Sequence, residues 1–254
     1  MEKQDIKSMT QEELRAFLVS LGEKPFRTAQ IYQWMHEKLA GSFEEMTNLS
    51  KTLRERLDET CRIITLRKEQ VQISKLDGTR KYLFLLEDGN VIESVLMKYK
   101  HGNSVCISSQ VGCRMGCRFC ASTIGGLVRH LRPGEILGQV IAAQRDTGER
   151  IDGIVLMGIG EPLDNYNNVI KFLRLVGSPD GLNIGYRHIS LSTCGLADRI
   201  PHLAEEHLPI TLSISLHAVS NNERSEIMPI NRRFNIDTLL CACRDYFDKT
   251  GRRI

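Results

Sequence analysis

The 254-residue sequence lacks the hydrophobic stretches that direct a chain to or across a membrane. No uninterrupted apolar run approaches the roughly 18 residues needed to cross a bilayer, and the first residues, Met1 to Asp5, are charged rather than apolar. These absences predict a cytoplasmic protein with no membrane partner. In the reducing cytoplasm its eight cysteines are poor candidates for structural disulfides, so metal binding or redox catalysis is the better expectation.

Acidic residues are also absent from Ser94 to Gly134, a stretch we call the basic span, although the net charge of the whole chain is only +3. The cations of this span are Lys98, Lys100, Arg114, Arg118, Arg129 and Arg132. Such a run is most often a solvated face. Here it surrounds three cysteines, so an anionic cluster, a cofactor or a phosphate backbone nearby is a second interpretation.

Apolar periodicity divides the chain into three predicted parts. Residues 1–63 show helical spacing and a capping box at Thr10 and Glu13, which predicts a small helical domain. In residues 64–98, two turn signals separate β-rich runs, which predicts a three-stranded antiparallel meander. Strands alternate with helices in residues 99–254, which predicts a parallel sheet with helices outside. This α/β part has about four parallel strands, and the chain ends where a fifth is expected, so we expect a C-terminally truncated, incomplete barrel.

Three cysteines stand close together in the sequence, at Cys113, Cys117 and Cys120. Their C-x3-C-x2-C spacing can supply three ligands to a [4Fe–4S] cluster and leaves the fourth iron free for a small chelating molecule. Gly112 and Gly116 would let the backbone turn tightly around the cluster. The alternative is structural zinc, but that metal prefers four protein ligands. Cys241 and Cys243 might be offered as a second ligand pair, but they lie in an amphipathic helix and are better explained by core packing.

The cysteine motif and several longer stretches resemble the RlmN/Cfr family of radical S-adenosylmethionine (SAM) RNA methyltransferases. The stretches are Gln30–Trp34, Ser42–Met46, Ile107–Cys113, Met157–Pro162, Leu191–Gly195, Ser215–His217 and Met228–Asn231. The similarity covers essentially the whole chain and implies a radical SAM partial (β/α) barrel.

The resemblance also implies a SAM site. It assigns SAM contacts to Gly160, Glu161, Ser192, Ser215, Leu216 and His217. The residues themselves agree in part, because Gly158-Ile-Gly-Glu-Pro162 follows an apolar strand, and parallel sheets bind ligands at the carboxyl ends of their strands. The carboxylate of Glu161 can accept hydrogen bonds from the ammonium group of a methionine. For His217, a structural role is an equally good explanation.

The family's chemistry uses two SAM molecules per turnover. One methylates a cysteine near the C-terminus, and the reduced cluster cleaves the other to a radical that activates this methyl group for addition to adenine C2. A base then removes the C2 proton, and a second cysteine releases the product by forming a disulfide bond. The resemblance assigns the base to Glu93 and the resolving cysteine to Cys106.

From the residues alone, Cys106 is equally well a buried strand residue. Glu93 faces either solvent or a site, and burial would raise its pKa and favour general-base work. The sequence also departs from the family pattern. The methyl-carrying cysteine belongs to a C-terminal Ala-Cys-Gly segment that is absent here, and Cys194 stands where serine is usual. We therefore expect this chain to lack the methyl carrier.

The implied substrates are 23S rRNA and tRNA, with the helical domain and the basic span as RNA-binding surfaces. The implied electron donor is a flavodoxin or ferredoxin, and the expected state is a monomer. Three alternatives stay open: methylation of adenine C8, as in Cfr relatives; a radical SAM activase of a partner protein; and a non-enzymatic iron–sulfur or zinc RNA-binding protein.

Overall fold

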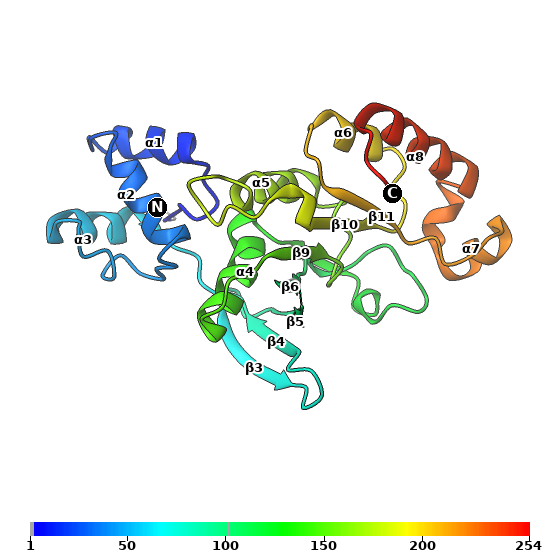
Figure 1. The fold of residues 1–254 in the computed structure, drawn as a ribbon, viewed down its shortest axis with the longest axis horizontal. Helices are drawn as coiled ribbons and strands as arrows, with labels where there is room; N and C mark the ends of the chain where they lie inside the picture. The colour runs from blue at the N-terminus through cyan, green and yellow to red at the C-terminus, as the bar shows by residue number, and fades with distance from the viewer. Residues whose placement is uncertain (1–2, 101) are drawn as a thin grey trace.

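A mixed seven-stranded sheet forms the centre of the computed structural model, which describes residues 3–100 and 102–254 (Figure 1). The strand order is β11-β10-β9-β6-β5-β4-β3. Its parallel strands are β6 (Gly102–Cys106), β9 (Gly153–Leu156), β10 (Ile189–Thr193) and β11 (Thr211–Ile214), and its antiparallel strands are β3 (Arg67–Ile73), β4 (Arg80–Leu85) and β5 (Val91–Tyr99). The four parallel strands and the meander agree with the prediction. The additional finding is that β5 pairs with β6, so both belong to one continuous sheet.

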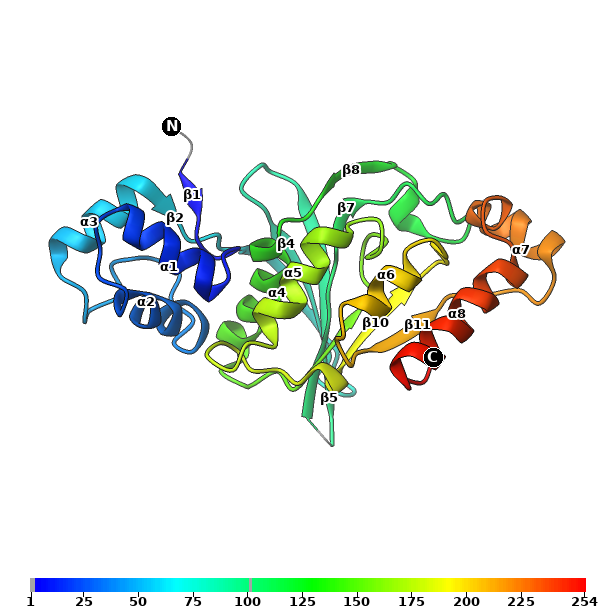
Figure 2. The same cartoon turned by 90° about the horizontal axis from the view of Figure 1, so that it is seen from above.

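Helices cover one face of this sheet (Figure 2). They are α4 (Pro133–Thr147), α5 (Tyr166–Val176), α6 (Ile200–Glu205) and α8 (Ile236–Thr250). Every second strand residue faces them, and Ile92, Val105, Ile154, Leu191 and Leu212 are fully buried there. Burying each such side chain contributes about 1.5–3 kcal/mol, so this layer is the main core. No helix in the described ranges combines the length and apolarity needed to span a membrane.

The N-terminal region has a second core of its own. It contains α1 (Gln11–Ser20), α2 (Arg27–His36) and α3 (Lys51–Thr60), and the predicted capping box of α1 is present. Two-residue parallel strands, β1 (Gln4–Asp5) and β2 (Cys61–Arg62), join the two ends of the region. Strands this short have no periodicity, so the sequence did not predict them. The region contacts the sheet layer where the backbone N–H of Gly134 donates to Ser8 (2.7 Å) and Lys171 pairs with Glu13 (2.7 Å).

Short elements complete the carboxyl edge of the parallel strands. A hairpin of β7 (Gln110–Gly112) and β8 (Leu127–His130) carries the cysteine loop, which includes the 3-10 turn η1 (Ala121–Thr123). After β11 come α7 (Asn221–Ile227) and η3 (Pro229–Arg232). At the opposite, amino edge, η2 (Tyr186–His188) precedes β10. These elements were not predicted from the sequence.

Candidate functional site

The face of the sheet opposite the helices is only half-buried. We call it the open face and define it by Glu93, Val95, Cys106, Val155, Ser190, Ser192 and Ser213. Strand register places Val95, Cys106, Val155 and Ser190 side by side in one row. The next row, towards the carboxyl ends of the parallel strands, contains Glu93 and Ser192. The open face therefore presents polar and thiol groups along the edge where parallel sheets bind ligands.

The cysteine loop lies at this edge and is held by its own backbone. The N–H of Cys113 donates to the carbonyl of Gly126 (3.0 Å), and the hydroxyl of Thr123 donates to the carbonyl of Cys120 (2.8 Å). Gly112 has a φ of +71°, and an added Cβ there would collide with the Gly126 carbonyl oxygen. The predicted glycine turn is confirmed, because this close approach and this φ both require glycine.

The three thiol groups of this loop lie near enough to interact electrostatically. Cys113 and Cys117 are buried and Cys120 is half-buried. Burial raises the pKa of the Cys113 thiol to about 11 and also raises that of Cys117, and negative charge on neighbouring thiolates adds to both shifts. All eight cysteines are free thiols; Cys241 is exposed, contrary to the prediction of core packing for it, whereas Cys243 packs against the core.

These thiols fit the ligand set of an iron–sulfur cluster. Among the described residues, no three His, Cys, Asp or Glu side chains converge tightly enough to hold a single metal ion. In a [4Fe–4S] cluster, by contrast, each thiolate binds a different iron, so the three sulfurs need not converge on one point. Cluster binding would also offset the cost of burying three thiolates, because the irons supply positive charge.

Glu161 is buried in the turn that follows β9. Its carboxylate accepts from the backbone N–H groups of Leu163 (3.0 Å) and Cys194 (2.7 Å), and its own N–H donates to Gln110 Oε1 (2.8 Å). Burial raises the pKa of Glu161, and the hydrogen bond from Cys194 opposes this shift. The carboxylate thus joins the ends of β9 and β10. Contact between the Glu161 carboxylate and SAM stays a prediction. A ligand bound there would share the carboxylate with the N–H groups of Leu163 and Cys194.

Ser192 and Ser215 come together as the sequence predicted for two strand ends. Their hydroxyl oxygens are 3.3 Å apart, and the N–H of Ser215 donates to the carbonyl of Thr193 (2.9 Å). His217 follows with a left-handed φ of +57°, and its ring contacts that of Phe119 in the cysteine loop, with centroids 4.9 Å apart. The predicted SAM residues of β10 and β11 therefore lie beside the cysteine loop.

Glu93 and Cys106 both belong to the open face. Cys106 pairs directly with Val95, which makes Glu93 its diagonal neighbour on the adjacent strand, about 7–8 Å away by usual sheet geometry. Cys106 is half-buried, and burial raises the pKa of its thiol. Glu93 is 43% exposed and forms an ion pair with Lys81 (2.8 Å), so the burial that would favour a general base is absent in this state.

Arg224 of α7 is a fully buried residue that sequence reasoning missed. Its guanidinium donates to the carbonyl oxygens of Cys194 (2.6 Å) and Leu216 (3.2 Å) and to Asn231 Oδ1 (3.0 Å). All of these acceptors are neutral, and Cys117 is close enough for its thiolate to favour the Arg224 charge. Arg224 therefore joins the ends of β10 and β11 beneath the cysteine loop. The Met228–Asn231 motif, which includes its partner Asn231, was the only available signal.

Acidic residues outside the basic span pair with half of its cations. Lys98 pairs with Glu149, Arg114 with Asp164, and Arg129 with both Asp88 and Glu135. These cations therefore help to hold the β7–β8 hairpin and the meander in place. Arg118, by contrast, is exposed on the cysteine loop.

Comparisons with known proteins agree with this architecture. Residues 107–251 match the radical SAM superfamily, so the fold and the cysteine loop define a radical SAM protein. Residues 4–63 match the ribosomal RNA large subunit methyltransferase N-terminal domain. A solved radical SAM methyltransferase from Sphaerobacter thermophilus superimposes with a TM-score of 0.94 at 40% identity, over 98% of this chain and 74% of that one.

Two relatives narrow the assignment. The chain is 57% identical to a probable dual-specificity RNA methyltransferase RlmN of Lachnospira eligens, over 98% of this chain and 71% of the relative. It is 56% identical to the protein of the same description from Lachnoclostridium phytofermentans, over 100% of this chain and 71% of the relative. The chain belongs to the RlmN family of radical SAM RNA methyltransferases.

Proposed function

We propose that the protein methylates C2 of adenine in 23S rRNA and tRNA, with a [4Fe–4S] cluster on Cys113, Cys117 and Cys120. The observation that carries this proposal is the contact between the cysteine loop and the strand ends that hold Ser192 and Ser215. When bound and reduced, the cluster would supply the electron that cleaves SAM. A flavodoxin or ferredoxin is the proposed source of that electron.

The chain's own residues would position the reactants. Gly160, Glu161, Ser192, Ser215, Leu216 and His217 would bind SAM at the carboxyl edge of the parallel strands. An adenine over the open face would lie near the diagonal pair Glu93 and Cys106. The carboxylate of Glu93 would take the C2 proton once substrate displaces its ion pair with Lys81.

We also propose that the three parts of the chain have different roles. Residues 1–63 and the exposed part of the basic span would bind RNA, residues 64–98 would carry the base, and residues 99–254 would bind both cofactors. The target adenine must leave its base stack to reach the open face, as in other enzymes that act on a base.

The cluster assignment is tested by anaerobic reconstitution with iron and sulfide. We expect a [4Fe–4S] electron paramagnetic resonance signal that changes when SAM is added. Cys117→Ser should lose the signal, whereas Cys241→Ser should keep it because Cys241 is exposed on α8. One tightly held zinc with no iron–sulfur chromophore would refute the cluster.

The substrate assignment is tested by mass spectrometry of rRNA and tRNA from a strain that lacks the gene. Loss of 2-methyladenosine supports C2 methylation, whereas loss of 8-methyladenosine alone would overturn it. Complementation with Glu93→Gln should restore no methylation, although its protein keeps the SAM-dependent signal. The matched control is Glu69→Gln on the exposed edge strand β3, which should restore methylation.

A further inference from the structure

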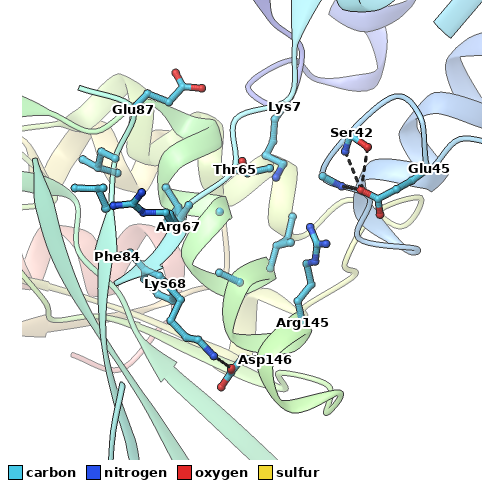
Figure 3. Close-up of a pocket in the computed structure, with 17 residues that line it drawn as sticks. Lys7, Ser42, Glu45, Thr65, Arg67, Lys68, Phe84, Glu87, Arg145 and Asp146 are labelled. Atoms are coloured by element: carbon cyan, nitrogen blue, oxygen red, sulfur yellow. Dashed lines mark hydrogen bonds and ion pairs between the residues drawn. The ribbon is translucent and has the colours of Figure 1, made fainter. Parts of the chain in front are cut away.

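A cavity of about 840 Å³ lies between the N-terminal region, strand β3 and helix α4 (Figure 3). Lys7 enters from the N-terminal region, and Ile141 and Arg145 come from α4. Phe84 also lines it, and this residue belongs to the helix-covered face of the sheet. The cavity is therefore separate from the open face and from the cysteine loop.

The carboxylates that line this cavity are already engaged. Asp146 pairs with Lys68 and with Arg80 (2.8 Å). Glu45 accepts from the backbone N–H of Ser42 (3.0 Å) and closes the turn that it belongs to. These acids are therefore committed to holding the walls together.

Two cations of the cavity differ from these paired groups. Lys7 is only 1% exposed, yet across the described residues its Nζ makes neither a hydrogen bond nor an ion pair. Arg145 is exposed on α4, and no hydrogen bond or ion pair of its guanidinium occurs among the described residues either. Figure 3 shows the two side chains pointing towards one another from opposite walls. Burial lowers the pKa of Lys7 to about 8; the carboxylates of Asp5 and Glu45 oppose this shift, and the positive charge of Arg145 adds to it.

We propose that this cavity binds a phosphate group between Lys7 and Arg145. A lysine side chain buried without an ion-pair partner is costly, and a second cation facing it adds repulsion, so an anion between the two would relieve both. A guanidinium offers paired N–H donors to phosphate oxygens, and an ammonium adds a compact charge. The cavity exceeds a phosphate in size and falls in the range of small-ligand sites, so the esterified part would lie along Leu66 and Ile141.

The test measures binding of inorganic phosphate and AMP by calorimetry and by the shift in melting temperature. We expect Lys7→Met and Arg145→Gln each to weaken binding at least tenfold, with partial recovery in Arg145→Lys. The matched control is Lys24→Met, an exposed lysine of the same region, which should bind as the parent does. Circular dichroism verifies that each variant is folded. None of these measurements needs the iron–sulfur cluster, so they are independent of the proposed methylation.

A second arm identifies the source of the phosphate group. If AMP binds, both variants weaken its binding at least tenfold and RNA binding is unchanged, the ligand is a free phosphate ester. If neither binds but both variants weaken binding of an RNA stem–loop, and the salt dependence falls by about one counterion, the ligand is an RNA backbone phosphate. If phosphate, AMP and RNA affinities are all unaffected by the two variants, the proposal is wrong.

Discussion

Arg224→Met is expected to lower the free energy of unfolding of the metal-free protein by about 3 kcal/mol. Methionine keeps much of the side-chain volume but removes the donors to Cys194, Leu216 and Asn231. The carbonyl of Leu216 keeps the N–H of Ala218, so the Cys194 carbonyl and Asn231 Oδ1 are the acceptors left without a donor, each at a cost of about 1–3 kcal/mol. Removing a desolvated charge offsets part of this cost. The measurement is urea denaturation, with the change read from the midpoint at an unchanged slope.

The matched control for this prediction is Arg232→Met, because Arg232 is an exposed arginine of the adjoining 3-10 turn. We expect its midpoint to change by less than about 0.5 kcal/mol. Arg224→Lys should fall between the two, since an ammonium keeps the charge but cannot reach all three acceptors. If Arg224→Met were as stable as the control, the role of Arg224 in joining β10 to β11 would be refuted.

Three further predictions follow from buried or strained positions. His36 is fully buried, and burial lowers its pKa from 6.5 to about 3, with the charge of Lys7 adding to the shift. Below pH 6.5 the unfolded chain therefore binds a proton at His36 that the folded protein does not bind. The free energy of unfolding should fall by about 1.4 kcal/mol per pH unit between pH 6.5 and 3. Denaturation of His36→Phe should show a weaker dependence on pH, and an unchanged dependence would contradict the assignment. Gln139→Leu should cost about 2–4 kcal/mol in the same assay, because it leaves the buried N–H and carbonyl of Ser108 without partners. Gly160→Ala should cost about 2 kcal/mol and weaken SAM binding in an equilibrium titration, because the φ is +106° and the new Cβ would lie 2.6 Å from Gln110; unaltered values for both would disprove the strain.

Features that depend on a few neighbouring residues could be predicted from the sequence. The capping box at Thr10 and the glycine turn at Gly112 follow from local backbone geometry. The period-2 burial of β5 follows from the pleat, which placed Ile92 in the core and Glu93 on the other face. The candidate cluster ligands were found in the same way, because all three cysteines lie within one loop.

Contacts between distant segments could not be predicted in this way. The ion pair of Lys81 with Glu93 requires the register of β4 against β5, which no local pattern specifies. Arg224 contacts Cys194, which lies thirty positions away in the sequence. Helical periodicity does not predict that an arginine is buried. The ion pairs of the basic span could not be predicted for the same reason, since Asp88 and Glu135 lie on other elements than Arg129.

Because the sheet is continuous, the pairing of β5 with β6 fixes the distance between Glu93 and Cys106. Because β5 pairs with β6 from Val95 to Tyr99, one inserted residue before Val95 would turn Glu93 towards the helices, and two would carry it about 7 Å along the strand. Insertions in the Glu87–Asn90 turn leave that count unchanged. The turns at the tips of the meander can therefore vary in length, whereas the number of β5 residues between Glu93 and Val95, the partner of Cys106, cannot.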